Sequence, residues 1–363
     1  MPGNFLELLF VAFYYFIIAI LLVIFVGQLF LSFPRRVKKI YSGSPSLETL
    51  IILPCKGIDF TFDENLKSLK NQSYKHYKLI AVVDSDDDLA LEYIKNNQID
   101  YILSDYNSSG SGKVRAIATA LRDFHDYEAY VIADSDVKAD MTWLEELLKP
   151  LTEDTYGIAT TFPYFEPRGG FWSRFKTAWG FVGTGMMQSE LTVFGWGGSL
   201  AFKKDLIGPE ELEKFSQSIS DDMALTDICR MKGKRVAFVP ESVVTINSPD
   251  SWETFSEWSI RQTSLLLSKT KKAFTIGILL YGSEALLMIG ALLLSILVSP
   301  YFIILFLPLI LNEIKMFKRL RRKEPIFILI QIILPFFYVW NLVKGSRNRT
   351  IAWRGNIYDL YER

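Results

Sequence analysis

The chain has 363 residues, half of them hydrophobic, a mean hydropathy of +0.18 and no formal net charge, because 40 basic residues balance 40 acidic ones. This balance does not favour a nucleic-acid partner. Two cysteines, Cys55 and Cys229, supply no disulfide framework and fit a reducing compartment. The two histidines, His76 and His125, form no cluster with them. A zinc site of the usual spacing is therefore not expected, and any chemistry should depend on carboxylates.

The first element is an apolar run over residues 6–31, which is long enough to cross a bilayer of about 30 Å. A basic segment, PRRVKK, follows at 34–39. A signal peptide would carry its charges before the apolar run, so we expect an uncleaved anchor over residues 1–33. The positive-inside rule then puts the N-terminus outside and the chain from residue 34 onward in the cytosol.

Residues 48–270 form the expected soluble domain. Apolar, strand-like runs alternate with helical patterns: strands at 49–55, 77–88, 100–105 and 129–137, and helices at 62–72, 89–97 and 113–124. This alternation predicts an α/β domain with a doubly wound, mostly parallel sheet. Ligands bind beyond the carboxyl ends of the strands in such sheets, and two acidic clusters fall at predicted strand ends.

Three further apolar segments form a C-terminal membrane region over residues 273–343, namely 273–298, 300–314 and 325–343. The first contains Glu284, a polar residue for which we assign no role. Strict alternation of spans would put the basic tail, residues 344–363, outside, whereas its lysines and arginines favour the inside. One of the last segments is therefore expected to be re-entrant or to lie in the membrane interface.

The stretch SSGSGKVRA, residues 108–116, resembles a phosphate-binding P-loop but lacks two of its defining residues. Val114 occupies the position of the required Ser or Thr, and Asn107 the position of the first glycine. Two interpretations remain open. The stretch is either a flexible loop before a helix or a loop that brings Lys113 to the phosphate or nucleoside of a ligand.

The two acidic strand ends suggest different ligands. In VVDSDDD, residues 82–88, the carboxylates form either a solvated turn or a site for a ribose, a nucleobase edge or a metal. In VIADSDV, residues 131–137, Asp134 and Asp136 flank Ser135 directly after a strand. This D-x-D spacing favours a hard divalent ion, Mg²⁺ or Mn²⁺, that bridges to a diphosphate.

Two later motifs are open to both structural and functional interpretations. FGWGGSLAFKKD, residues 194–205, is either an ordinary turn or a turn whose glycines permit positive φ and close approach of a ligand, with Trp196 stacking on a sugar. Asp221 and Asp222 precede a helical run. They either cap that helix or include a general base for a hydroxyl.

This ordered set of motifs resembles the inverting GT-A glycosyltransferases of family 2, most closely the ceramide glucosyltransferase-like branch. The resemblance covers about residues 50–270 and the membrane segments on both sides, and it includes ILPCKGID at 52–59 and ENLKSL at 64–69. A late stretch, WSIRQ at 258–262, corresponds to the branch's Gln/Arg-x-x-Arg-Trp motif through its arginine. IAWRGNIY at 351–358 is similar to a C-terminal segment of the branch, and we expect it near the membrane face of the site.

The resemblance implies a role for each matching residue. The donor-binding set is Asp84, Asp86, Lys113, Asp134, Asp136 and Arg261, and the acceptor-side set is Trp196, Gly197, Asp221 and Trp258. Asp134 and Asp136 would hold the metal, and Asp222 would be the catalytic base.

We therefore expect a multi-pass membrane enzyme whose cytosolic domain moves a hexose, by default glucose, from a nucleoside-diphosphate sugar such as a UDP-sugar to a lipid hydroxyl. One alternative is transfer to a polyprenyl phosphate, which needs no base. A second is a catalytically dead nucleotide-sugar-binding scaffold. A processive synthase or a transporter would need more membrane spans.

Overall fold

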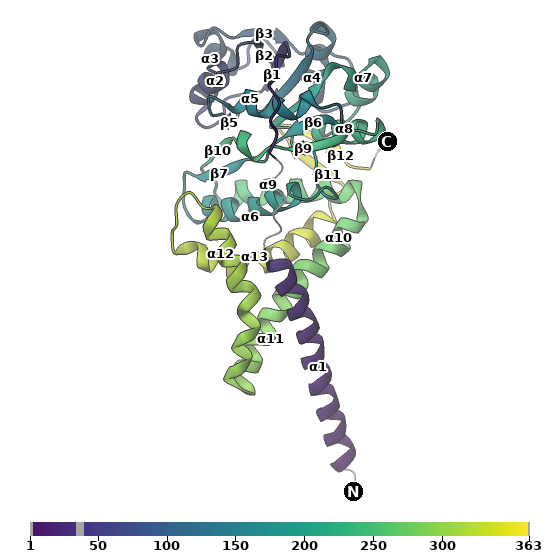
Figure 1. The fold of residues 1–363 in the computed structure, drawn as a ribbon, viewed down its shortest axis with the longest axis vertical. Helices are drawn as coiled ribbons and strands as arrows, with labels where there is room; N and C mark the ends of the chain where they lie inside the picture. Colours follow the sequence, from purple (N-terminus) through teal and green to yellow (C-terminus); the bar gives the residue numbers. More distant parts are fainter. Residues whose placement is uncertain (1–2, 34–39, 362–363) are drawn as a thin grey trace. The chain divides into compact units, whose positions relative to one another are not determined.

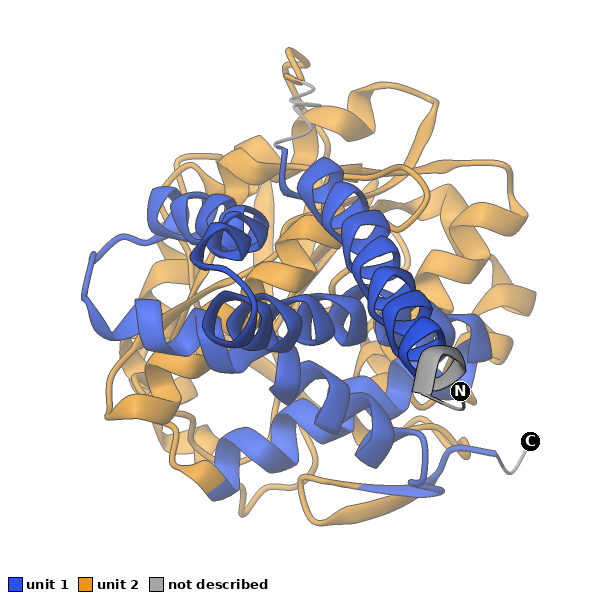
Figure 2. Ribbon diagram, turned by 90° about the horizontal axis from the view of Figure 1, so that it is seen from below, with its two compact units in different colours: residues 1–36, 253–351, 359–363 blue, residues 37–252, 352–358 orange. Residues whose placement is uncertain are grey.

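The computed structural model describes residues 3–33 and 40–361. The basic segment 34–39, which guided the expected orientation of the N-terminus, lies outside the described residues. The chain divides into two compact units, coloured separately in Figure 2. We call Val37–Trp252 with Ala352–Tyr358 the α/β unit, and Met1–Arg36 with Glu253–Ile351 and Asp359–Arg363 the helical unit.

The α/β unit is built on a seven-stranded sheet of order β3-β2-β1-β4-β8-β6-β9. Its strands are β1 Thr49–Cys55, β2 Tyr77–Val83, β3 Asp100–Leu103, β4 Ala129–Ala133, β6 Tyr156–Thr160, β8 Ser199–Lys203 and β9 Arg235–Phe238. The first four strands pair in parallel, and so do β6 and β9. Only β8 of these seven described strands runs against both of its neighbours. The expected mostly parallel sheet is confirmed.

Helices cover both faces of this sheet, and this explains why the central strands show no alternation of polar and apolar residues. In β1, the side chains of residues 50–53 are fully buried on both faces. Figure 1 shows α2, α3 and α5 on one side and α4, α7 and α8 on the other. The helices of the unit are α2 Phe62–Lys70, α3 Ala90–Asn96, α4 Gly112–Asp123, α5 Trp143–Leu148, α6 Phe171–Met187, α7 Pro209–Ser216 and α8 Asp221–Met231.

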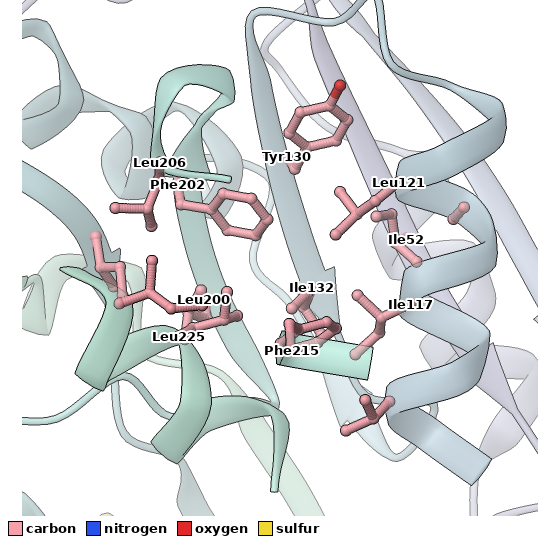
Figure 3. Close-up of a cluster of buried hydrophobic side chains, with 14 of the residues drawn as sticks. Ile52, Ile117, Leu121, Tyr130, Ile132, Leu200, Phe202, Leu206, Phe215 and Leu225 are labelled. Atoms are coloured by element: carbon pink, nitrogen blue, oxygen red, sulfur yellow. The ribbon is translucent and has the colours of Figure 1, made fainter. Parts of the chain in front are cut away.

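One apolar cluster holds α4, α7 and α8 against the sheet (Figure 3). Ile117 of α4 and Leu225 of α8 are completely buried in it, with Ile132 of β4 and Phe202 of β8. Burial of each such side chain stabilises the fold by about 1.5–3 kcal/mol. The N-termini of α4 and α8 lie close together, because Lys113 in the first turn of α4 contacts Asp221 in the first turn of α8.

A second, three-stranded sheet of order β5-β10-β7 completes the α/β unit. Its strands are β5 Val137–Lys138, β7 Tyr164–Pro167 and β10 Thr245–Ser248. β5 follows the D-x-D stretch directly and pairs antiparallel with β10. The loop that carries Asp134 and Asp136 is therefore anchored in the large sheet at one end and in the small sheet at the other.

The helical unit contains α1 Gly3–Ser32, α10 Lys271–Gly277, α11 Ser283–Leu297, α12 Leu307–Arg319, α13 Ile326–Gly345 and most of α9 Trp252–Lys269. Among the described residues, four helical segments are long and apolar enough to cross a membrane: 7–32, 271–297, 300–319 and 326–345. Leu21 of α1, Leu287 of α11 and Leu305 pack together. Gln28 donates hydrogen bonds to the carbonyl of Leu280 (2.7 Å) and the hydroxyl of Ser283 (2.8 Å). α1 and α11 are thus joined by apolar and polar contacts.

The end of the chain forms a hairpin rather than an irregular basic tail. β11 Thr350–Trp353 pairs with β12 Asn356–Asp359. Arg354 and Gly355 lie at the turn with φ angles of 49° and 82°. Two successive residues with positive φ are typical of a tight two-residue hairpin turn, which the Arg-Gly pair permits. The tip, residues 352–358, belongs to the α/β unit.

Candidate active site

The D-x-D stretch and the glycine-rich turn meet at one edge of the large sheet. β4 and β8 are antiparallel neighbours, and Ala133 at the end of β4 pairs with Ser199 at the start of β8. The residues just beyond both strands are therefore adjacent. The backbone N–H of Asp134 donates a hydrogen bond to the carbonyl of Gly198 (3.2 Å).

Lys113 joins this edge to the paired acids of α8. Its Nζ lies 2.7 Å from Oδ1 of Asp134 and 3.0 Å from Oδ2 of Asp221. The Lys113 side chain is only 12% exposed and that of Asp221 only 5%. Burial alone would lower the pKa of Lys113, but the two carboxylates outweigh it and raise the pKa. Lys113 therefore remains charged, and its interaction with a nucleotide sugar remains a prediction.

Gly197 provides the room for this ion cluster. A Cβ at this position would lie 2.2 Å from Oδ2 of Asp221 and 3.0 Å from Nζ of Lys113. The Gly197 carbonyl also accepts a hydrogen bond from Lys113 (3.2 Å). Positive φ was one expected reason for glycine in this turn, but Gly195, Gly197 and Gly198 have no positive φ. The close approach of neighbouring side chains requires the glycine here, not the backbone conformation.

Asp136 lies beside Asp134, and its buried Oδ1 has no hydrogen-bond partner among residues 3–33 and 40–361. Burial, together with the negative charges of Asp134 and Asp59, raises the pKa of Asp136 to about 7. A buried, unpartnered carboxylate oxygen is costly unless a cation or donor meets it. This donor set fits a hard divalent cation, which prefers carboxylate, phosphate and water oxygens.

The protein supplies few ligands for such a cation. Within residues 3–33 and 40–361, no group of three or more His, Cys, Asp or Glu side chains has the geometry of a metal site. Asp134 and Asp136 would therefore hold the ion together with water and ligand oxygens. Mg²⁺ is commonly bound in this way, through one or two carboxylates and the phosphates of a substrate.

Asp222 differs from its neighbour Asp221. The carboxylate of Asp222 is partly buried and accepts hydrogen bonds from the Ser220 hydroxyl and from the backbone N–H of Met223 (2.7 Å). Burial, together with the negative charge of Asp221, raises the pKa of Asp222 to about 6. The N-cap residue of α8 is Ser220, so capping alone does not account for the acidic pair.

The first acidic cluster divides into exposed and structural residues. Asp84 and Asp86 are exposed just beyond β2, and Asp84 forms an ion pair with Lys56 (3.0 Å). Asp88 instead accepts hydrogen bonds from the backbone N–H groups of Gly57 (3.0 Å) and Ala90 (2.8 Å). Asp88 thus holds the loop after β1 at the start of α3. The contact of Asp84 and Asp86 with a nucleoside remains a prediction.

The loop before α4 is packed against α7 and the C-terminal hairpin. Ser111 is the N-cap of α4, and its hydroxyl accepts a hydrogen bond from Val114 (3.3 Å). A Cβ on Gly110 would lie 2.0 Å from the carbonyl of Ser216, so this glycine lets the loop pack on the end of α7. The backbone N–H of Gly112 donates to the Tyr358 hydroxyl (3.3 Å). These contacts fix the start of α4, and with it Lys113.

The residues expected on the acceptor side and in the late motif are divided between the two units: Trp196 belongs to the α/β unit, and Trp258 and Arg261 belong to the helical unit. Trp196 is partly buried against the core, 6.0 Å from the ring of Phe162 between centroids. Its backbone N–H donates to Thr160 (2.9 Å). Trp258 and Arg261 lie on the part of α9 that belongs to the helical unit. Their assignment to the acceptor and donor, like that of Trp196, remains a prediction.

Sequence reasoning missed Asp59, Lys56, Arg354 and Tyr358 as candidate site residues. Asp59 accepts hydrogen bonds from the Ser135 hydroxyl and from Nη2 of Arg354 (2.7 Å). Asp59 lies in the quoted segment 52–59 and Arg354 in 351–358, so both lay in segments that already resembled the branch. What the sequence lacked was any indication that these segments meet.

A mostly parallel sheet with one reversed strand, which continues into the D-x-D stretch after β4, has the GT-A fold. The family model for glycosyl transferase family 21 matches residues 15–363, and the chain belongs to this family. The sequence resemblance named family 2, so the family number differs, while the ceramide glucosyltransferase-like branch is consistent with the match. The protein is an enzyme of the glycosyltransferase class.

Solved structures of glycosyltransferases are similar to this chain. A mannosyltransferase from Pyrobaculum calidifontis, in complex with GDP-Man and Mn²⁺, shares 17% identity over 93% of this chain and 96% of its own, with a TM-score of 0.50. Glucosyl-3-phosphoglycerate synthase from Mycobacterium tuberculosis, in complex with Mn²⁺ and UDP-glucose, shares 16% identity over 61% of this chain and 79% of its own, with a TM-score of 0.42. The likeness to the mannosyltransferase shows a common fold.

Proposed function

We propose that this enzyme is a membrane-bound, inverting glycosyltransferase that moves a hexose from a nucleoside-diphosphate sugar to the hydroxyl of a lipid. The observation that carries the proposal is the position of Asp222. This carboxylate stands beside the Lys113–Asp134–Asp221 cluster, and its pKa is raised to about 6. A carboxylate with a raised pKa is a better general base near neutral pH than an ordinary one.

The carboxylates of the D-x-D stretch and the shared fold both support a nucleotide-sugar donor. Asp134 and Asp136 suit a divalent cation, which would offset the negative charge that develops on the leaving nucleoside diphosphate. The mannosyltransferase of the same fold was solved with GDP-Man and Mn²⁺, which supports a nucleotide-sugar donor and Mn²⁺ or Mg²⁺ here. UDP-glucose is the first donor to test.

In the proposed transfer step, Asp222 acts as the general base. Its carboxylate takes the proton of the acceptor hydroxyl as the hydroxyl oxygen forms a bond to the anomeric carbon of the sugar. The bond from that carbon to the diphosphate oxygen breaks on the opposite side, so the configuration inverts and the nucleoside diphosphate leaves with the bonding electrons. Asp221 stays paired with Lys113, and its negative charge helps to hold the Asp222 pKa up.

A lipid acceptor is supported by the apolar helices. We propose that α1, α11 and the segment 300–319 cross the membrane and that α13 lies in the interface. α1, α11 and this segment share one apolar cluster. Clusters of basic residues near 34–39, 269–272 and 315–323 would then all lie on the cytosolic side. The hairpin tip after α13 packs in the α/β unit, which supports a cytosolic end for α13.

The test uses the full-length protein in detergent with Mn²⁺ or Mg²⁺, labelled UDP-glucose, UDP-galactose and GDP-mannose, and a total lipid extract. Mass spectrometry of the lipid phase should reveal one glycosylated lipid, with inverted anomeric configuration by NMR. Asp222→Asn should lower the rate by about 100-fold or more. Asp227→Asn, an exposed carboxylate on the same helix, is the matched control and should leave the rate unchanged.

Two results would redirect the proposal. A polyprenyl phosphate product formed at nearly full rate by Asp222→Asn would mean that the acceptor is already an anion and needs no base. Binding of the nucleotide sugar with no product from any donor and lipid would favour a binding scaffold instead.

A further inference from the structure

The C-terminal hairpin contributes side chains to the acidic edge of the α/β unit. Nη2 of Arg354 donates a hydrogen bond to Oδ1 of Asp59 (2.7 Å), and Nη1 donates to the carbonyl of Lys56 (3.0 Å). On the other strand of the hairpin, the Tyr358 hydroxyl accepts a hydrogen bond from Gly112 (3.3 Å). The hairpin thereby connects the loop after β1 to the start of α4.

The turn places Arg354 where carboxylates are concentrated. Asp59 also accepts a hydrogen bond from Ser135, the central residue of the D-x-D stretch. The positive charge of Arg354 opposes the rise in the pKa of Asp136. Burial lowers the pKa of Arg354, but Asp59 in the first place, and then Asp136 and Asp134, outweigh it and raise the pKa. The guanidinium is therefore electrostatically coupled to the pair that would hold the cation.

The other cations of this edge are already engaged. Lys113 is enclosed between Asp134 and Asp221, and Lys56 pairs with Asp84. Arg354 is also paired, with Asp59, and is about as exposed as Lys56 (41% and 43%), but its two hydrogen bonds use only two of the five guanidinium N–H groups. A planar guanidinium with free N–H groups can bind phosphate oxygens in a bidentate manner.

We propose that Arg354 binds the diphosphate of the donor, and that the hairpin 350–359 is a part of the donor site contributed from beyond the membrane segments. This inference rests on the proposed function, because it requires a nucleoside-diphosphate donor. Asp59 and the Lys56 carbonyl hold the guanidinium in place before the donor arrives, which reduces the entropy lost on binding. The alternative is a purely structural role, in which Arg354 only stabilises the hairpin on the α/β unit.

The test measures binding rather than turnover. UDP and GDP, each with Mn²⁺, and Mn²⁺ alone are titrated by calorimetry into the full-length wild type, Arg354→Ala, Arg354→Lys and Arg347→Ala. Arg347 is an exposed arginine of the same C-terminal region and is the matched control. Uridine and guanosine, which lack phosphates, are the control ligands.

For the better-bound diphosphate, we expect Arg354→Ala to weaken affinity by about 10- to 100-fold, as for loss of a charged hydrogen-bonding group. Arg354→Lys should lose less, and Arg347→Ala should match the wild type. Binding of Mn²⁺ alone should be unchanged or tighter in Arg354→Ala, because a competing positive charge is removed. The nucleosides should bind all four proteins equally.

Three results would overturn the inference. Equal diphosphate affinity in Arg354→Ala and the wild type would remove Arg354 from the donor site and leave the proposed function intact. If Arg354→Ala lost affinity equally for Mn²⁺ alone and for the diphosphate, while Arg354→Lys bound both like the wild type, Arg354 would have the purely structural role. A wild type that binds neither nucleoside diphosphate would overturn the inference together with the proposed function.

Discussion

The ammonium group of Lys113 lies 3.0 Å from a carboxylate oxygen of Asp221, and both residues belong to the first turns of their helices, α4 and α8. The core beneath the two helices brings these turns together. The ion pair therefore links the loop that resembled a P-loop to the acidic pair that includes the proposed base. Loss of either partner would leave a buried charge without compensation.

Lys113→Met should destabilise the protein, because Asp221 and Asp134 would lose their common cation. Removal of one partner from a buried ion pair costs about 3–5 kcal/mol. We expect a clearly lower midpoint in thermal unfolding followed by tryptophan fluorescence in detergent. Lys78→Met is the matched control, because Lys78 pairs with Asp100 on the surface, where both side chains are exposed by 40% or more. Such pairs contribute about 0–1 kcal/mol. Equal midpoints for the two variants would contradict a buried ion cluster.

Gly197→Ala should reduce activity and stability together. The new Cβ would lie 2.2 Å from Oδ2 of Asp221, so the carboxylate or the turn must move. Overpacking of a tight site costs about 1–3 kcal/mol, and the shift would also reach Lys113. Gly185→Ala in α6 is the control, because a Cβ there meets nothing within 4 Å. We expect the control to be as stable as the wild type or slightly more so, since alanine favours a helix. An active, stable Gly197→Ala enzyme would show that the turn has spare room.

The transfer rate should fall on acidification through about pH 6, because the pKa of Asp222 is raised to about 6 and only its deprotonated form accepts the acceptor proton. Below this pH, kcat should decrease about tenfold per pH unit, and above it the rate should level off. The measurement is a pH–rate profile at saturating donor and metal. In Asp222→Asn the residual rate should no longer fall as the pH is lowered through 6. If the fall persists in the variant, it is due to the protonation of another group.

Ser346→Cys, just after α13, should react with a membrane-impermeant maleimide only from the side that carries the α/β unit. Tyr301→Cys, between α11 and α12, should react only from the opposite side. Both positions are exposed. The native thiols Cys55 and Cys229 are buried, and burial raises the pKa of each, so background labelling should be low. Labelling of both introduced cysteines from the same side would exclude the proposed three-span topology.

Much of the α/β fold was predictable from local sequence patterns. The run TLIILPC predicts β1 to its last residue, and the other strands before the D-x-D stretch begin where expected. The acidic residues that follow β2 and β4 were also expected at the ends of strands. These features depend on the periodicity of neighbouring residues, which the sequence displays directly.

The long-range contacts of the site were not predictable from the sequence. Asp88 looked like part of a ligand-binding acidic turn, yet it holds a backbone loop and the start of a helix. No sequence pattern marked Asp59 as a candidate site residue. Its place in the site depends on hydrogen bonds from Ser135 and Arg354, which are distant from it in the sequence. Such contacts depend on packing, and a single sequence does not encode them in local periodicity.

The membership of residues 352–358 in the α/β unit has a consequence for biosynthesis. A ribosome makes α1 first, then the strands of the large sheet and the carboxylates at its edge, then α10–α13, and only afterwards Arg354. Asp59 is thus made long before the guanidinium with which it pairs, and the hairpin can dock only after α10–α13 have been synthesised. The ion pair between Arg354 and Asp59 is therefore one of the last contacts of the α/β unit that the growing chain can make.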